Sequence, residues 1–143
     1  MSQSELAATV LACGLLVVSL ATHAVAWTTR AGRLARNHTF GIRTPSTQAS
    51  DEAWHAAHRA ALPWLTWAHR VGYTGAVLAL ILASAFAVLA GSINIAALLT
   101  VVIGAYLVVL ACITVGSVVA TRKARSVGVR EQGSQGELPG DTS

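Results

Sequence analysis

Charged residues are absent from three long stretches of this chain. Asp, Glu, Lys and Arg do not occur in residues 6–27, 71–90 or 95–120. Each stretch is about 20 residues or longer, which at ~1.5 Å of rise per residue lets a helix cross the hydrocarbon core of a bilayer. Only 11% of the 143 residues are charged and 54% are hydrophobic, so little sequence is left for a separate soluble domain. We therefore predict an all-α membrane protein with three transmembrane helices.

Cysteine is scarce as well, and the two cysteines form neither a CxxC nor a Cys/His ligand pattern. Cys13 and Cys112 lie in different predicted spans, at depths that differ by roughly 15 Å. A disulfide requires a Cα separation of only ~4.4–6.8 Å. We predict two unpaired thiols that pack as small apolar side chains.

The first five residues lack the Lys or Arg with which a secretory signal opens. Residues 24–26 resemble a signal-peptidase site, but arginines follow directly after Trp27, and basic residues at that place retain a segment in the membrane. We therefore expect residues 1–5 to form a short extracytoplasmic N-terminus and residues 6–27 to stay as the first span.

All ten Lys and Arg residues lie on one side of the three spans. They occur at Arg30, Arg33, Arg36, Arg43, Arg59, Arg70, Arg122, Lys123, Arg125 and Arg130. Cytoplasmic segments of membrane proteins collect Lys and Arg, so the asymmetry predicts the orientation in the inner cell membrane. We expect an outside N-terminus, a cytoplasmic loop at 28–70, an extracytoplasmic turn at 91–94, and a cytoplasmic tail at 121–143. The tail is basic at first and, from Arg130 on, has the composition of a disordered segment.

Three arginines follow the first span at three-residue spacing. Arg30, Arg33 and Arg36 share one face if the helix continues, and we expect them to bind anionic lipid headgroups. The chain lacks the interleaved aromatics or the recognisable module of a nucleic-acid-binding protein, so we predict no nucleic-acid partner.

His23 is the one histidine within the predicted spans. It lies one helical turn from Trp27 at the inner boundary of the membrane, where a hydrogen-bonded imidazole costs little. We therefore favour a structural role for it over a functional one. Without a carboxylate or a cation elsewhere in the spans, the sequence offers no proton relay, which argues against a transporter.

The loop at 28–70 begins with turn-forming residues. Gly41 can adopt a positive φ, and Pro45 directs the preceding residue toward extended backbone. A helix start follows, with a Ser or Thr cap and with Asp51 and Glu52 near its positive end. Pro63 is expected to kink or break this helix. We predict a short interfacial helix before the second span, with an aromatic belt formed by Trp64, Trp67 and Tyr73.

We considered a metal or catalytic site in the same loop. Asp51, His55 and His58 occupy adjacent positions on a helix, but they do not form an HExxH motif, and His38 or water would have to supply a fourth ligand. Ser and Thr residues are not paired by spacing with a His–carboxylate couple. We predict no metal, no cofactor and no catalytic residue. A pairing in space stays open, so the alternative is a small membrane enzyme or transporter that uses the polar loop.

A pattern of polar and aromatic residues fills 37–59, directly before the second span. It consists of Asn37, Gly41, Ile42, Arg43, Thr44, Thr47, Ser50, Trp54, His58 and Arg59. This pattern resembles the signature of the SdpI-type integral membrane proteins. The resemblance implies immunity against a secreted peptide toxin, or signalling in which the membrane protein sequesters a repressor at the cytoplasmic face. The dedicated immunity members resemble longer chains with additional spans upstream, whereas this chain has only the three-span unit.

We therefore predict non-enzymatic binding of a peptide or protein partner at the membrane, in toxin immunity or membrane signalling. Arg43 lies between the glycine-containing bend and the helix start. We favour a structural role for Arg43, in which its planar guanidinium latches the loop by bonding backbone carbonyls or the carboxylates of Asp51 and Glu52. In the other interpretation, Arg43 and Arg59 together hold an anion or a peptide carboxylate of the partner.

Overall fold

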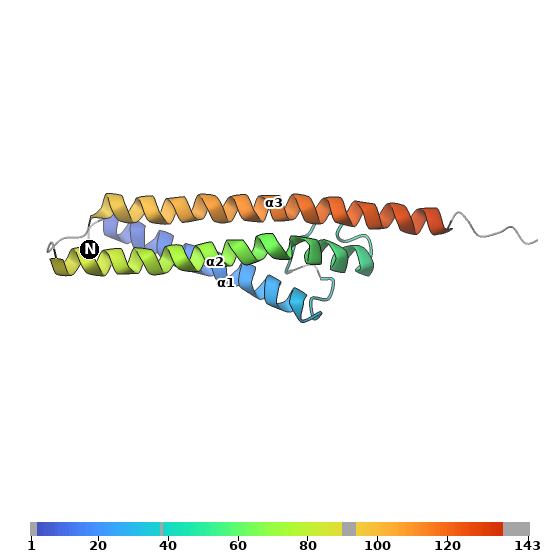
Figure 1. Ribbon diagram of the computed structural model, residues 1–143, viewed down its shortest axis with the longest axis horizontal. Helices are drawn as coiled ribbons and strands as arrows, with labels where there is room; N and C mark the ends of the chain where they lie inside the picture. Colours follow the sequence, from blue (N-terminus) through green and yellow to red (C-terminus); the bar gives the residue numbers. More distant parts are fainter. Residues whose placement is uncertain (1–2, 38, 90–93, 136–143) are drawn as a thin grey trace, which may run out of the picture.

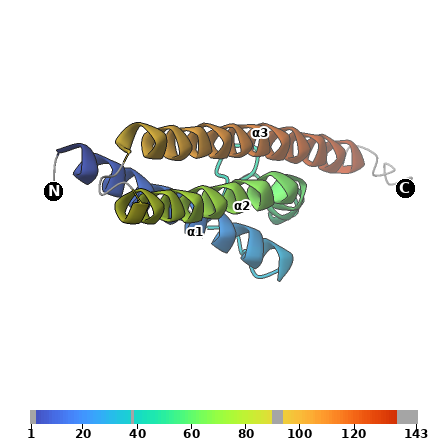
Figure 2. The ribbon, with the colours of Figure 1, turned by 60° about the vertical axis from the view of Figure 1, so that its left-hand side comes forward.

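Three helices make up the fold (Figure 1). The computed structural model describes residues 3–37, 39–89 and 94–135. Helix α1 spans Gln3–Arg30, α2 spans Asp51–Leu89, and α3 spans Ile95–Gln135. Helices α2 and α3 lie side by side along most of their length, and α1 crosses α2 obliquely (Figures 1 and 2). Each contains a segment long and apolar enough to cross a membrane, which confirms the predicted all-α fold with three such helices.

The helix ends follow from local sequence. After Arg30, Gly32 adopts a φ of 65°. The amides of Gly32 and Arg33 bond back to the carbonyls of Thr29 and Thr28, which is a Schellman ending. At the start of α2, the Ser50 hydroxyl accepts a hydrogen bond from the Ala53 amide at 3.1 Å.

Helix α2 starts earlier than the predicted second span. The short interfacial helix expected before residue 71 is not a separate element, because its residues form the first part of the 39-residue α2, with Pro63 inside the helix. Pro63 is itself exposed, while Ala61 and Leu65 on either side are buried in the core. Burial of these neighbours compensates for the backbone bond that the proline removes.

Helix α3 continues past the predicted end of the third span at residue 120. Ala120 and Ala124 are buried and Val127 packs against the same cluster, so contacts with the rest of the protein hold this part helical. The expected disorder from Arg130 onward is therefore wrong for residues up to Gln135. The predicted disordered residues 136–143, most of the predicted turn at 91–94, and residues 1–2 lie outside the described residues.

Small side chains allow the helices to approach closely in the middle of the bundle. A Cβ built on Gly75 would lie 2.5 Å from the Cβ of Ala105, and one on Gly72 would meet the side chain of Ser19. The Tyr106 hydroxyl donates to the Leu11 carbonyl at 3.0 Å and so ties α3 to α1. Such close packing is the usual basis of helix association in membranes.

Large apolar side chains are exposed on all three helices, among them Val10, Val17, Leu20, Leu80, Ile81, Val88, Leu107 and Leu110. A surface of this kind is unfavourable in water and suits contact with lipid tails. Cys13 and Cys112 are both free thiols; Cys112 packs against a core cluster as predicted, whereas Cys13 is exposed. The arrangement fits a multi-pass membrane protein.

Candidate partner-binding site

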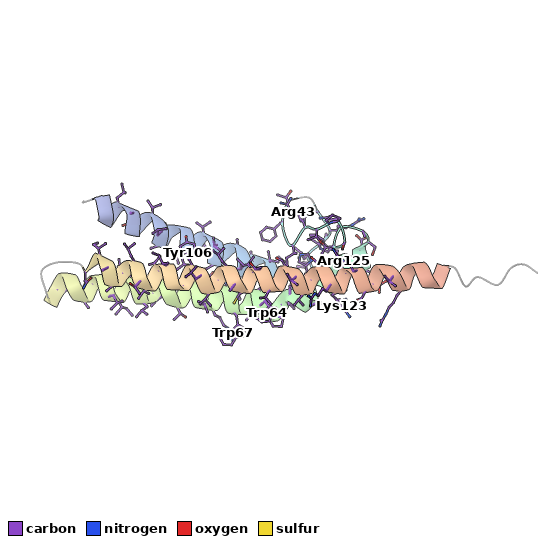
Figure 3. The ribbon with its side chains drawn as sticks, turned by 90° about the horizontal axis from the view of Figure 1, so that it is seen from above. Arg43, Trp64, Trp67, Tyr106, Lys123 and Arg125 are labelled. Atoms are coloured by element: carbon purple, nitrogen blue, oxygen red, sulfur yellow. The ribbon has the colours of Figure 1, made fainter. Side chains whose placement is uncertain are left out.

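The segment between α1 and α2 folds over the start of α2 and reaches α3 (Figures 1 and 3). Outside a short run of turn at residues 45–48 it contains little regular structure. Its shape therefore depends on side chains that satisfy its backbone groups. Most of these side chains belong to the predicted 37–59 pattern.

Trp54, in the first turn of α2, is fully buried. Its indole Nε1 donates to the carbonyl of Leu34 at 2.8 Å. A buried tryptophan needs such a partner for its single N–H donor. The ring thus fixes the chain just after α1 against the start of α2.

His58 lies one turn further along α2 and is only 1% exposed. Its Nδ1 is 2.9 Å from the carbonyl of Trp54, and its Nε2 is 2.9 Å from the amide nitrogen of Ile42. Because the amide can only donate, Nε2 must be the acceptor and Nδ1 must carry the proton. His58 is therefore a neutral imidazole with both nitrogens bonded to backbone. We call Trp54 and His58, with the Leu34 carbonyl and the Ile42 amide, the loop anchor.

Gly41 is required by the loop anchor in two ways. Its φ of 109° is a conformation that side chains disfavour. In addition, a Cβ at this position would lie 2.6 Å from Nε2 of His58 and 3.0 Å from Cη2 of Trp54. The glycine lets the backbone pass directly over the two rings.

The bend after Gly41 is closed by two threonines. The buried Thr47 hydroxyl accepts from the Thr44 amide and donates to the Ile42 carbonyl, both at 2.8 Å. Ile42 itself packs against the core cluster at this end of the bundle. The hydroxyl of Thr44 also lies 3.5 Å from that of Thr121 on α3.

Asn37 organises the start of the bend. Its Oδ1 accepts from the amides of Thr39 and Phe40 at 2.9 and 2.6 Å, and its Nδ2 donates to the Ala35 carbonyl at 2.8 Å. The Gln48 side chain donates to the Asn37 carbonyl at 3.0 Å. These bonds connect the two ends of the bend.

The three arginines after the first span have contacts within the protein. Arg36 donates through Nε to the Asp51 carboxylate at 2.7 Å and through Nη1 to the Gln48 carbonyl at 2.8 Å. Arg30 donates to the hydroxyl of Thr66 on α2, and Arg33 lies over the Trp27 ring. The Asp51 carboxylate, considered as a partner of Arg43, is thus bonded to Arg36.

The residues of the predicted pattern divide into an inner and an outer group. Trp54, His58 and Thr47 are buried and Ser50 caps α2, so these residues shape the loop. Arg43 and Arg59 are exposed, as are Asp51 and Glu52. The described residues contain no group of three His, Cys, Asp or Glu side chains placed to hold a metal.

Two residues of α3 that contact the loop were not predicted from the sequence. On α3, Arg125 donates to the Ser46 hydroxyl at 3.4 Å, and the buried Ala124 packs under the loop end. The signal for this packing is the apolar spacing of Ala120, Ala124 and Val127, which continues at helical period beyond the charge-free stretch.

A second cluster lies between α1 and α2. The rings of His23 and His69 are stacked with centroids 4.7 Å apart, and Nδ1 of His23 lies 3.2 Å from the Tyr73 hydroxyl. His69 donates through Nδ1 to the Leu65 carbonyl at 2.9 Å. These contacts support the structural interpretation of His23.

Comparison with known proteins gives one family. The model of the SdpI/YfhL protein family matches residues 33–120, which include the whole 37–59 pattern, α2 and most of α3. Neither the curated proteins nor the solved structures gave a match to the chain. The family match covers more than half of the 143 residues, and the chain belongs to the SdpI/YfhL protein family.

Proposed function

We propose that this protein binds a peptide or protein partner at the cytoplasmic face of the inner cell membrane, as a component of toxin immunity or membrane signalling. The observation that carries the proposal is the loop anchor. It uses buried side chains to hold an otherwise irregular segment in one conformation. A preorganised loop loses little conformational entropy on binding, and recognition surfaces are commonly loops on a rigid scaffold.

The exposed residues of the 37–59 pattern are the proposed contacts. Arg43 extends from the bend that the loop anchor holds, and Arg59 lies on the exposed side of α2. Guanidinium groups suit carboxylates, including those of acidic side chains and a peptide C-terminus. We extend the proposal to anionic lipid at Arg30, Arg33 and Arg36, since their internal contacts leave further N–H donors on each guanidinium.

A catalytic or transport role of the polar loop is less well supported. Such a role needs a side chain that can exchange a proton or bind substrate. Both ring nitrogens of His58 are bonded to backbone, and the carboxylate of Asp51 is paired with Arg36. Membership of the family also favours binding over catalysis.

The test is photo-crosslinking in native membranes, with a photoreactive amino acid placed at Arg43 and, as a control, at Val77 on the exposed apolar part of α2. We expect a discrete protein or peptide adduct from position 43 and only lipid adducts from position 77.

Expression of the protein should also change the sensitivity of cells to a membrane-active peptide or relocate a soluble regulator. Arg43→Ala should weaken both effects. Only lipid adducts from position 43, together with unchanged sensitivity and localisation, would contradict the proposal.

A further inference from the structure

One face of α3 carries an open groove of about 490 Å³. Along the helix it is lined by Ile113 and Thr114 at one end, by Ser117, Val118 and Thr121 in its middle, and by Arg122 and Arg125 at the other end. The lining therefore changes along the helix from apolar and hydroxyl-bearing side chains to two cationic ones. The cationic end suits the phosphate of a phospholipid, and the apolar and hydroxyl-bearing part suits the ester region and the adjoining part of an acyl chain.

The depth of the groove in the membrane follows from two independent features. From Ile95 to Gly116, α3 rises ~32 Å, about the thickness of the hydrocarbon core. Gly116 also lies level with Trp64, because a Cβ on Gly116 would be 3.1 Å from the Trp64 Cβ. Trp64 and the neighbouring Trp67 are exposed and project from the bundle (Figure 3), as side chains of an aromatic belt do at the boundary.

Both features place the boundary at the middle of the groove. Ile113 then lies on the acyl-chain side. Arg122 lies about 9 Å beyond Gly116 along the helix, in the headgroup region. Arginine side chains at this level extend toward phosphate groups.

The loop holds one of the two arginines in position. Arg125 donates through Nε to the Ser46 hydroxyl at 3.4 Å, and this bond uses one of five N–H donors on the guanidinium. The four remaining N–H donors, on the two terminal nitrogens, form the fork that suits a phosphate. Arg122, three residues earlier on the same helix, supplies a second charge on the groove wall.

From this arrangement we infer that the groove on α3 is a binding site for one anionic phospholipid, with the start of an acyl chain along Ile113, the ester region along Ser117 and Val118, and the phosphate between Arg122 and Arg125. The inference is independent of the proposed partner. It also differs from a general attraction of basic residues to anionic membranes, because it requires both the charges and the apolar part of the groove.

The test uses the full-length protein in a neutral detergent, titrated with phosphatidylglycerol and followed by native mass spectrometry and thermal unfolding. Phosphatidylcholine and inorganic phosphate are the comparison ligands. We expect phosphatidylglycerol to bind more tightly than phosphatidylcholine or inorganic phosphate, and to raise the unfolding temperature of the protein more than either ligand does. Arg122→Gln with Arg125→Gln should weaken its binding roughly tenfold or more, since each arginine near phosphate contributes about 1 kcal/mol.

Two matched variants separate the site from its alternatives. Lys123→Gln with Arg130→Gln removes the same charge from exposed positions of α3 outside the groove, and should leave binding close to that of the unmodified protein. Ser117→Trp fills the groove without changing charge and should abolish lipid binding while the unliganded protein unfolds at its usual temperature. Any one of three results would overturn the inference. The two double variants could lose lipid affinity equally, inorganic phosphate could bind as tightly as the lipid, or Ser117→Trp could bind the lipid as well as the unmodified protein does.

Discussion

At the scale of the residue, the shape of the loop is determined by a few buried polar side chains that bond to backbone. Trp54 and His58 are one turn apart on α2, and their common face is evident from the sequence spacing alone. Their partners, the Leu34 carbonyl and the Ile42 amide, were not predictable. Backbone groups are present at every residue and carry no sequence signal, so only the folded loop shows which of them a side chain meets.

The position of Gly41 over the two rings gives the sharpest prediction at this scale. Gly41→Ala should strain a backbone at φ 109° and also force a methyl group against Nε2 of His58. Gly32→Ala is the matched control, because Gly32 also has positive φ but a Cβ there would meet nothing within 4 Å. We expect Gly32→Ala to cost about 1–2 kcal/mol and Gly41→Ala distinctly more.

The measurement is the thermal unfolding temperature in detergent, together with protease resistance of the loop. Equal effects of the two substitutions would show that contact with Trp54 and His58 does not constrain the loop.

At the scale of the element, the three stretches without charged residues predicted three helices long enough to cross a membrane. They did not predict where each helix begins and ends. Residues 95–120 were predicted as the third span, and α3 in fact continues to Gln135. The charged residues after 120 end the apolar stretch without ending the helix, because Ala120 and Ala124 pack under the loop. Likewise, Pro63 does not separate an interfacial helix from the second span, since buried neighbours hold α2 together.

The extension of α3 beyond residue 120 can be tested by overpacking. Ala124 is 1% exposed, whereas Ser126 on the same helix is exposed. Ala124→Leu should destabilise the protein by about 1–3 kcal/mol, because the cluster has no room for the larger side chain. Ser126→Leu should stay within about 0.5 kcal/mol of the unmodified protein. Unfolding in detergent measures both, and a tolerated Ala124→Leu would mean that this part of α3 does not pack on the loop.

At the scale of the whole molecule, the basic residues gather at the end of the bundle that carries the loop and the second half of α3. The loop, the arginines after α1 and the groove on α3 all lie at this end. The family match from 33 to 120 covers nearly all of the loop, all of α2 and α3 up to residue 120, and it omits α1 entirely. The unit matched by the family is thus the loop with α2 and the part of α3 up to residue 120. The proposed partner contacts on the loop lie within this unit, whereas Arg122 and Arg125 of the groove follow directly after it.

The proposed orientation is tested by cysteine labelling in a background of Cys13→Ala and Cys112→Ala. Because basic segments stay in the cytoplasm, Ser2→Cys should react with an impermeant thiol reagent in intact cells, and Thr39→Cys only after lysis. Thr39 is exposed on the loop, so its labelling after lysis is an internal control for accessibility. The reverse pattern would place the loop and the groove on the outer face.

The most direct test of the central claim, that the loop anchor holds the 37–59 pattern in one conformation, is amide hydrogen exchange at Ile42. In the unmodified protein this amide should exchange slowly, because it donates to the buried Nε2 of His58. His58→Ala removes the acceptor at a cost of about 1–3 kcal/mol, and exchange at Ile42 should accelerate roughly tenfold or more. Arg33→Lys, which keeps the charge of a side chain that lies over the Trp27 ring, should leave the rate unchanged. An Ile42 amide that exchanges as fast as an unstructured peptide in the unmodified protein would contradict the account.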